Sequence, residues 1–503
     1  MLIIHPPLTK PCEPPAAPAY LAAALTAHGH ACSVCDMNIE ALEHISRTAR
    51  PHGDTWTDRA ARNIGRNLGA LRDTRTYGSF DRYARAVADI DRFLAMAGKD
   101  FDLQLSLANY QDNGRSPVKS ADLRAAAADY RANIFSPYFS RRLDELIEKT
   151  RCARIGFSLT YLSQALATFA MIGYLRARHP EQAIILGGGL VTTWLSNPGW
   201  RNPFTDLVDH FIAGRGEKPL LSLLGSEHRE YHPLPDFSGL GDNRYLSPGF
   251  VLPYAASFGC FWRKCSFCPE KSEENPYAQV PPVTAIAHLQ SLCAVHSPAL
   301  IHLLDNAISP AMLRAICKEP PGAPWYGFAR IDRLLTDRDF CRRLREAGCV
   351  MLKLGLESGD QEVLDRMHKG IDLRRASTVL ENLHEAGIAT YVYLLFGTPS
   401  ESRAEAERTW QFVEEHHRAI DFLNLAIFNL PIGSNEAEAL PINDFYEGDL
   451  SIYRNFTHPR GWDRPEVRRF LSSFKRSPKI AAILRNDPPL FTSNHAPFFA
   501  RYR

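Results

Sequence analysis

The 503-residue sequence lacks several features that would define its class at once. No apolar run approaches ~20 residues, so we expect no membrane span. The N-terminus opens apolar but soon meets Pro6 and Pro7, with no basic segment and no long apolar stretch, which is unlike a signal peptide. Internal repeats and low-complexity stretches are missing too. We therefore expect a cytoplasmic protein.

An excess of charge of either sign is also lacking. The chain has 58 basic and 56 acidic residues and a net charge of +2, which gives no reason to expect nucleic acid or an anionic membrane as a partner. The apolar fraction of 45% is that of a globular protein, and the length predicts two or three domains. Eleven cysteines in a long chain without a secretion signal indicate thiols and metal ligands, not a disulfide framework.

Short apolar strands alternate with helices in the first part of the chain, which predicts a doubly wound α/β domain over residues 1–225. From about 40 to 150 the sequence is polar, rich in Arg and Ala and helical in period, so we interpret it as a helical insertion. In a parallel sheet the C-terminal strand ends form the ligand crevice. The predicted strands lie at 2–7, 32–38, 154–160, 183–189 and 207–217, with helices at 16–28 and up to about 179.

A second α/β run follows a stretch rich in Pro, Gly and Asp, residues 226–250, which predicts a linker. From 251 to 432 six strands alternate with helices, which predicts a partial TIM barrel with its active site at the C-terminal strand ends. Residues 433–503 hold few strand signals and predict a helical C-terminal extension, either a cap on a substrate pocket or a packing element. The six predicted strands are YAASFG, LIHLLDN, WYGFARI, VMLKLGLES, TYVYLLFG and FLNLAIF.

Three cysteines follow the first predicted barrel strand within nine residues: Cys260, Cys265 and Cys268. A cubic 4Fe–4S cluster usually takes four thiolates, so a loop that offers three leaves one iron with an open coordination position. An open position is where a substrate or cosubstrate binds. The alternatives are a structural zinc site or incidental core cysteines. Structural zinc usually takes four ligands, and the remaining cysteines are distant in sequence and fall in apolar patterns typical of buried thiols.

The region from 253 to 431 resembles the radical S-adenosylmethionine superfamily, whose hallmark is a three-cysteine loop after the first strand of a partial TIM barrel. This chain has four residues between its first two cysteines where three are usual. The resemblance implies a 4Fe–4S cluster that cleaves S-adenosylmethionine reductively. It places Phe267 near the adenine, Asp305 and Asn306 at the amino end of the cosubstrate, Arg330 on its carboxylate, and Glu357 on a ribose hydroxyl or the ammonium group.

The same resemblance implies that Gly397 and Pro399, after the fifth barrel strand, let the backbone approach the adenine. For each of these residues taken alone, a solvated loop or a capping contact is an equal alternative. All of them, however, are expected at C-terminal strand ends of one barrel, and this coincidence is the stronger argument.

The N-terminal pattern resembles the cobalamin-binding domain that precedes the barrel in many radical S-adenosylmethionine enzymes. Glycines and small hydroxyl side chains at strand ends let a flat corrin approach the backbone closely. The usual corrinoid signature has a histidine two residues after an aspartate, and here Asn38 follows Asp36, so bound cobalamin is expected to lack a histidine ligand. The alternative is a nucleotide-type scaffold without corrin. The matching residues are Pro7, Asn38, Ser158, Thr160, Gly187, Gly188, Gly189, Gly214 and Glu217.

The resemblance as a whole implies a cobalamin-dependent enzyme that methylates a carbon of a small-molecule substrate. It also implies an electron donor such as flavodoxin or ferredoxin. A radical cyclase, rearrangement or carbon–carbon coupling enzyme without methyl transfer is the alternative reaction class. A corrinoid-binding sensor or carrier is the alternative outside enzymes, and the three-cysteine loop argues against it because a carrier needs no open iron.

Overall fold

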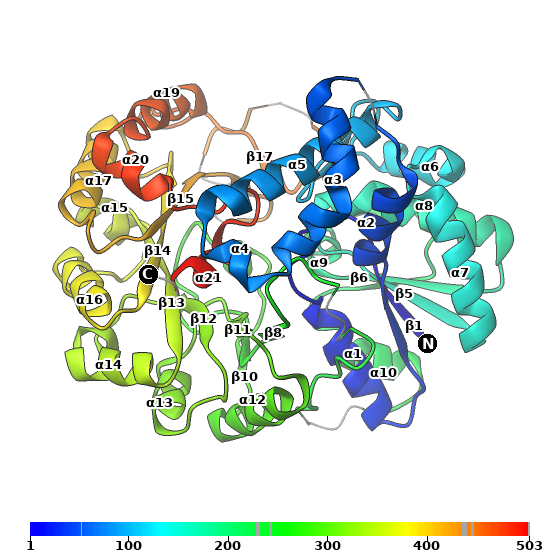
Figure 1. The fold of residues 1–503 in the computed structure, drawn as a ribbon, viewed down its shortest axis with the longest axis horizontal. Helices are drawn as coiled ribbons and strands as arrows, with labels where there is room; N and C mark the ends of the chain where they lie inside the picture. Colours follow the sequence, from blue (N-terminus) through cyan, green and yellow to red (C-terminus); the bar gives the residue numbers. More distant parts are fainter. Residues whose placement is uncertain (52, 228–231, 241–243, 435–439, 444–446, 501–503) are drawn as a thin grey trace. The chain divides into compact units, whose positions relative to one another are not determined.

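The computed structural model describes residues 1–51, 53–227, 232–240, 244–434, 440–443 and 447–500. The chain divides into two compact units: Met1–Phe250 with Tyr446–Ile452, and Val251–Phe445 with Tyr453–Arg503. Each unit is built on a parallel sheet with helices around it, so the predicted α/β class is confirmed (Figure 1). In the part of the chain described, no helix combines the length and apolarity that a bilayer crossing requires.

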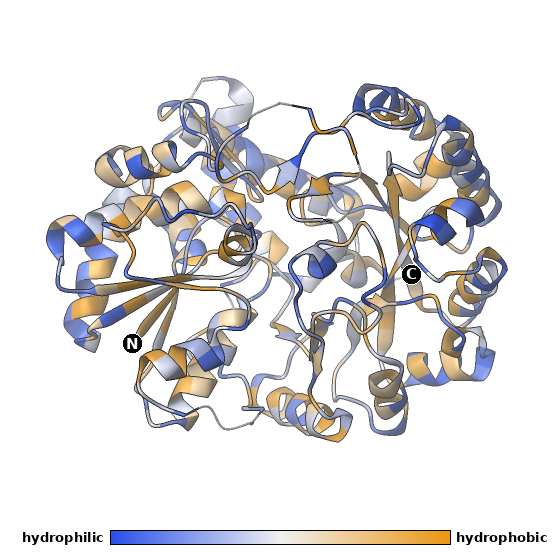
Figure 2. Cartoon of the chain, turned by 180° about the vertical axis from the view of Figure 1, so that it is seen from behind, coloured by the Kyte–Doolittle hydropathy of each residue, from blue (hydrophilic) through white to orange (hydrophobic). Residues whose placement is uncertain are grey.

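The first unit contains a five-stranded sheet in the order β2-β1-β5-β6-β7, and all its neighbours run parallel. Its central strands β1, β5 and β6 are mainly apolar and buried, and Figure 2 shows hydrophobic colouring along the sheet. Ile3 and Ile185 pack with Leu25 and Leu220 in one core cluster. The bounds are β1 Leu2–His5, α1 Ala16–Ala27, β2 Ser33–Asp36, α2 Met37–Thr48, β5 Arg154–Ser158, α8 Leu162–Arg178, β6 Ala183–Gly187, α9 Gly189–Leu195, β7 His210–Ile212 and α10 Glu217–Leu223.

The stretch between α2 and β5 is mainly helical, and it also holds an antiparallel hairpin that the helical interpretation did not include. The long helices α3 and α5 of this stretch pack against each other, and α6 packs on α8. The stretch is therefore tied to the helical layer of the sheet. Its elements are α3 Thr55–Leu71, α4 Thr74–Tyr77, α5 Phe80–Lys99, β3 Leu103–Leu105, β4 Tyr110–Asp112, α6 Ser120–Ala128 and α7 Ser136–Thr150.

The second unit contains a six-stranded parallel sheet in the order β15-β14-β13-β12-β11-β8, so chain order and spatial order agree as in a partial TIM barrel. Helices connect the strands. Its strands and connecting helices are β8 Val251–Tyr254, α12 Pro282–His296, β11 Leu300–Leu303, α13 Pro310–Lys318, β12 Trp325–Ala329, α14 Arg338–Glu346, β13 Cys349–Glu357, α15 Gln361–Arg366, α16 Leu373–Glu385, β14 Ala389–Phe396, α17 Arg403–Glu415 and β15 Phe422–Ile427.

The first barrel strand begins earlier than the sequence pattern predicted. β8 ends at Tyr254, and the following residues form a separate short strand, β9 Ser257–Phe258, which pairs antiparallel with β10 Ala278–Gln279. The cause is Asp305, whose carboxylate accepts hydrogen bonds from the Ala256 N–H (3.0 Å) and the Ser257 hydroxyl (2.5 Å). The cysteine loop therefore starts from a fixed side branch of the sheet.

The C-terminal part of the second unit is helical, with one short strand pair, β16 Leu430–Pro431 and β17 Tyr453–Arg454. The helices are α19 Arg464–Phe474, α20 Pro478–Leu484 and α21 Ala496–Ala500. α20 packs on β15 and α21 on β13, and the Tyr391 hydroxyl on β14 donates to Asp487 (2.7 Å). These residues are thus part of the barrel's packing.

Candidate functional site

The three cysteines lie in the loop between β9 and α11, Pro269–Ser272. Cys265 is buried, with 8% of its surface exposed, while Cys260 and Cys268 are half-buried. The negative charge of the Cys260 thiolate contributes to the raised pKa of both other thiols, so the three sulfurs are electrostatic neighbours. Burial is the larger cause, and it raises the pKa of Cys268 to about 11.

Three thiols in one loop are the kind of ligand that a cubic iron–sulfur cluster takes. Within the described ranges, no group of three or more His, Cys, Asp or Glu side chains is arranged to hold one metal ion. In a cubic cluster each thiolate binds a different iron, so the sulfurs stand farther apart than the ligands of one zinc. The other cysteines of this unit lie in α12, α13, α14 and at the start of β13.

The predicted cosubstrate residues do lie at C-terminal ends of adjacent strands. Asp305 and Asn306 follow β11, and Arg330 follows β12. Asn306 is exposed, whereas Asp305 is buried and uses its carboxylate to brace the chain before the cysteine loop. Burial raises the pKa of Asp305 to about 6, against the hydrogen bonds from Ser257 and Ala256 that lower it.

Glu357 ends β13 at a bulge and has a left-handed backbone conformation, with φ of 68°. Its carboxylate forms an ion pair with the Lys369 ammonium at 2.8 Å, and both side chains are largely buried. The Lys369 ammonium lies 5.5 Å from the centre of the Phe267 ring. Glu357 and Phe267, predicted separately, are thus linked through a lysine that the sequence reasoning did not single out.

The turn after β14 contains Gly397 and Pro399 and is held by Glu401. The Glu401 carboxylate accepts hydrogen bonds from the Gly397 N–H (2.5 Å) and the Trp462 indole (2.9 Å). Burial raises the pKa of Glu401 to about 8. A small pocket beside this turn is lined by Gly397 and by residues that follow β15 or belong to the C-terminal extension, among them Phe428, His458 and Trp462.

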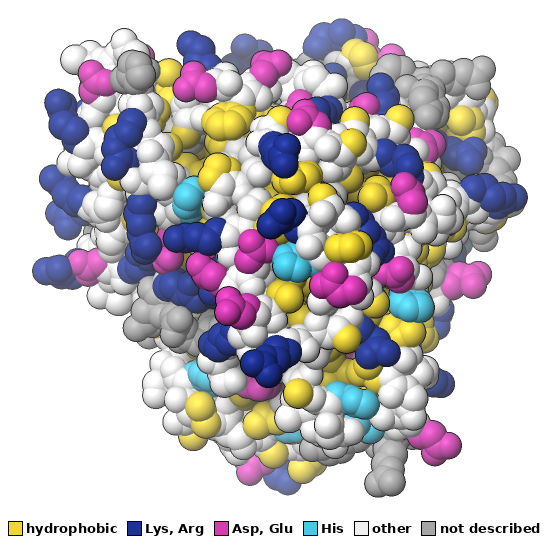
Figure 3. Space-filling view, turned by 90° about the vertical axis from the view of Figure 1, so that its right-hand side faces the viewer, with side chains coloured by type: hydrophobic (Ala, Val, Ile, Leu, Met, Phe, Trp, Pro, Cys, Tyr) yellow, Lys and Arg dark blue, Asp and Glu magenta, His cyan; other side chains and the backbone are white. Residues whose placement is uncertain are grey.

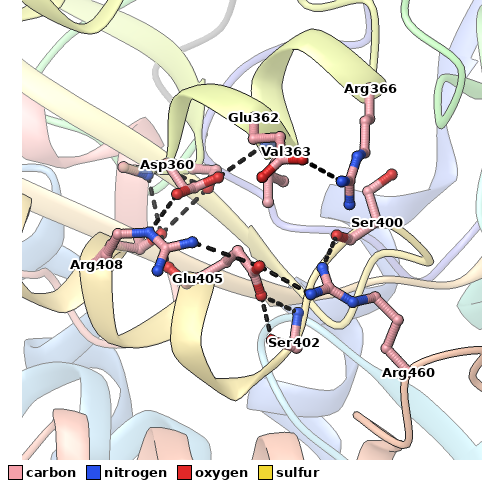
Figure 4. Close-up of polar contacts among 12 residues, drawn as sticks. Asp360, Glu362, Val363, Arg366, Ser400, Ser402, Glu405, Arg408 and Arg460 are labelled. Carbon is pink, nitrogen blue, oxygen red and sulfur yellow. Dashed lines mark hydrogen bonds and ion pairs between the residues drawn. The ribbon is translucent and has the colours of Figure 1, made fainter.

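An ionic network joins the residues that follow this turn to the C-terminal extension and to the start of α15 (Figure 4). Glu405 accepts from the Ser402 N–H (2.8 Å) and from Arg460 (2.9 Å), and Arg408 donates to Asp360 (2.5 Å). Burial raises the pKa of Glu405, but the hydrogen bonds from Ser402 and Arg460 outweigh it and lower that pKa to about 2. Glu405 therefore stays charged, and it fixes the turn to α17 and the C-terminal extension.

In the first unit the predicted corrinoid residues lie along one sheet edge, and hydrogen bonds join neighbouring loops there. The Asn38 side chain exchanges hydrogen bonds with the Thr9 backbone (2.9 and 3.2 Å), which ties the segment after β1 to α2. The Leu159 N–H donates to the Gly187 carbonyl (2.7 Å), and the Gly214 N–H donates to the Thr192 hydroxyl (2.9 Å). Hydrogen bonds therefore join the segment after β1 to the one after β2, and the segment after β6 to those after β5 and β7.

Gln164 is a residue of this edge that sequence reasoning missed. It is fully buried, its amide donates to the Pro6 carbonyl (2.7 Å), and its oxygen accepts from the N–H groups of Thr160 and Tyr161 (3.0 Å each). It thereby fixes Pro7 next to the Ser158–Thr160 segment. A Gln three residues into a predicted helix is a capping signal that could have indicated it. Ser158 is buried, and Glu217 pairs with Arg215 (3.0 Å).

The fold is that of a two-unit α/β protein with a three-cysteine loop after the first strand of a partial barrel. Residues 254–413 match the radical SAM superfamily, which confirms the resemblance that the cysteine loop predicted. The chain carries a radical SAM domain, and this superfamily implies a 4Fe–4S cluster and S-adenosylmethionine as cofactors.

Two curated relatives match over less than half of this chain. An uncharacterized methyltransferase of Pyrococcus horikoshii is 23% identical over 236 residues, covering 42% of this chain and 50% of that protein. The anaerobic magnesium-protoporphyrin IX monomethyl ester cyclase of Cereibacter sphaeroides is 21% identical over 222 residues, covering 38% and 36%. The chain thus spans half or less of the length of these relatives.

One solved protein shares the fold over nearly the whole chain, the radical S-adenosylmethionine methyltransferase TsrM from Kitasatospora setae. Its structure with tryptophan substrate and a SAM analogue has a TM-score of 0.56 at 14% identity and covers 96% of this chain and 88% of that one. A structure of TsrM with cobalamin and a 4Fe–4S cluster bound has a TM-score of 0.50 at 16% identity, covering 88% and 80%. At these identities the likeness shows the fold.

Proposed function

We propose that the protein is a cobalamin-dependent radical S-adenosylmethionine enzyme that methylates a carbon of a small-molecule substrate. The observation that carries this proposal is the combination, in one chain, of a three-thiol loop in a radical SAM domain and a parallel sheet whose joined strand-end loops resemble a corrinoid site. When bound, the cluster supplies the electron that cleaves S-adenosylmethionine, and cobalamin supplies the methyl group.

The protein's own residues would bind and orient these groups. Cys260, Cys265 and Cys268 hold the cluster, and the Gly397–Pro399 turn receives the adenine through its backbone. Asp305 acts indirectly by fixing the start of the cysteine loop. The residues at the C-terminal strand ends of the first sheet, among them Pro7, Asn38 and Gly188, hold the corrin. A low-potential donor of the flavodoxin or ferredoxin type supplies electrons.

The relative named as a cyclase favours a second candidate, a radical reaction that closes a ring without methyl transfer. The balanced net charge of +2 does not favour a nucleic-acid substrate, and Lys and Arg are interspersed with Asp and Glu over the face drawn in Figure 3. The two enzyme candidates differ in what happens to the methyl group of the cosubstrate.

Product analysis separates the two candidates. With reductant and substrate, we expect 5′-deoxyadenosine and S-adenosylhomocysteine in a ratio near one to one after uncoupled cleavage is subtracted, because each turnover uses one cosubstrate molecule for each purpose. Methyl-labelled cosubstrate should leave its label on a product carbon. Accumulation of 5′-deoxyadenosine alone, with no methyl group gained by the product, would establish the ring-forming candidate instead.

The proposal includes cobalt without a protein histidine below it. His5 is the histidine that must be tested as a cobalt ligand. It ends β1, is buried, and has an Nδ1 with no hydrogen-bond partner among the described residues. Burial lowers its pKa, with Asp36 opposing, so the imidazole is neutral and able to bind a metal. The Asn38 side chain does not replace a histidine ligand, because both its polar atoms form hydrogen bonds with the Thr9 backbone.

We expect the electron paramagnetic resonance spectrum of the Co(II) form to show no hyperfine splitting from a protein nitrogen. Wild-type protein and the His5→Phe variant should give the same spectrum, because the His5 ring is held by the Thr9 hydroxyl at 3.2 Å. A nitrogen splitting that disappears in His5→Phe would show that the prediction is wrong.

A further inference from the structure

The cysteine loop is fastened to a second segment, Met367–Gly370, which follows α15 and lies about 100 residues later in the chain. Two hydrogen bonds join them. The Trp262 indole N–H donates to the His368 carbonyl (3.0 Å), and the Ser266 N–H donates to the Met367 carbonyl (3.1 Å). Trp262 is one of the four residues between the first two cysteines, where three are usual. The side chain that fastens the loop therefore lies in the part of the loop that is longer than usual.

Gly370 makes this anchor possible. It has a φ of 69°, and a Cβ atom placed on it would lie 2.2 Å from Cζ2 of the Trp262 ring. Only glycine permits both that conformation and such a close approach. The indole therefore packs directly against the backbone at Gly370.

Two positive charges are fixed by the same contacts. The Arg330 guanidinium lies 4.2 Å from the centre of the Trp262 ring and donates to the Lys369 carbonyl (2.5 Å). The Lys369 ammonium lies 5.5 Å from the Phe267 ring, one residue before the last cysteine, and pairs with Glu357 (2.8 Å). The Arg330 side chain is thus bound to the cysteine loop and to the Met367–Gly370 segment.

Both cations lie against the loop that carries the three thiols. Arg330 contacts the ring of Trp262, which stands between Cys260 and Cys265, and Lys369 contacts the ring of Phe267, the residue before Cys268. Positive charge is therefore concentrated beside the residues that would ligate iron.

We propose that Arg330 and Lys369, held in place by Trp262, raise the reduction potential of the cluster. Reduction adds one electron from the donor and no proton to the cluster, so its net negative charge grows, and nearby cations stabilise the reduced form. Charge and hydrogen bonds around the sulfurs are the established determinants of such potentials. The inference rests on the cluster assignment above and makes Arg330 a positioning and tuning residue instead of a carboxylate ligand.

The test is an anaerobic redox titration of reconstituted protein with dithionite, followed by electron paramagnetic resonance, without S-adenosylmethionine and with iron and sulfide measured. At the wild-type midpoint potential, Arg330→Gln and Lys369→Gln should each lower the ratio of reduced to oxidised cluster by about tenfold, which corresponds to ~59 mV for one electron. Arg330→Lys and Lys369→Arg keep the charge and should stay close to wild type. Glu357→Gln, which removes a negative charge from Lys369, should raise the ratio.

Arg366→Gln is the matched control. It removes one positive charge from α15, next to the segment in sequence, but the Arg366 guanidinium pairs with Glu362 of the same helix (Figure 4). Its ratio should equal that of wild type. Wild-type ratios in Arg330→Gln and Lys369→Gln proteins with full iron content would overturn the tuning proposal alone. A wild-type protein that forms no cluster would overturn the cluster assignment as well.

Discussion

Replacing Cys265 by alanine is expected to remove the cluster, lowering iron from about four per chain to near zero after anaerobic reconstitution. The three thiols lie in one loop, and among the described residues no other cysteine lies in that loop to replace a lost ligand. Cys260→Ala and Cys268→Ala should behave alike. Iron and sulfide content and the visible absorption of the protein measure this loss.

Cys317→Ala is the control for that experiment. Cys317 lies in α13, is half-buried, and has a pKa raised to about 11 by burial, so its thiol is inert. This variant should keep its full iron content. Full iron in the Cys265→Ala protein, or one zinc per chain in wild type without sulfide, would contradict the cluster assignment.

The sequence predicted the strands and the cysteine loop because both depend on local patterns. Apolar runs of strand length between helical segments led to β11 through β15, and their order in the sheet follows from the rule that consecutive βα units lie side by side. The first strand was misplaced because its end depends on Asp305, fifty residues later, which no local pattern reveals.

The segment that fastens the cysteine loop was missed for a related reason. Met367 and His368 contact the loop through backbone carbonyls, and every residue type offers a carbonyl. Gly370 was the available signal, since a glycine after a short helix often has a positive φ, but this does not reveal that Trp262 packs on it. From sequence alone Lys369 would be expected to be exposed to solvent. In the structure it is largely buried and pairs with Glu357.

A polar pair inside the barrel sheet was detectable from sequence but was not considered. Lys353 stands in the middle of an otherwise apolar strand, β13, and its ammonium lies 2.9 Å from the His302 ring on β11. Both residues are buried, and the His302 ring stacks on Tyr326 at 4.3 Å. A lysine inside an apolar strand indicates a buried partner, because an unpaired buried charge is costly. The partner's identity required the sheet order.

Among the residues proposed to hold the corrin, Gly188 is the one whose backbone most requires glycine. This residue has φ of 111° and ψ of 177°, a conformation essentially restricted to glycine, and a Cβ atom on it would lie 2.3 Å from the Leu159 carbonyl oxygen. The loops after β5 and β6 are therefore in direct backbone contact, supported by the hydrogen bond from Leu159 to Gly187 (2.7 Å). An alanine at this position must push the two loops apart.

We expect Gly188→Ala to weaken corrinoid binding by about tenfold or more, since strain of ~1–3 kcal/mol falls on the loops proposed to hold the corrin and 1.4 kcal/mol is a factor of ten. The absorbance of hydroxocobalamin retained after gel filtration measures this. Gly225→Ala is the control, because Gly225 also has a positive φ (75°) but nothing within 4 Å of its Cβ position. Iron content should be normal in both variants. Retention of wild-type corrinoid by Gly188→Ala would show that these loops do not hold the cofactor, and a wild-type protein that binds no corrinoid would identify the first unit as a scaffold.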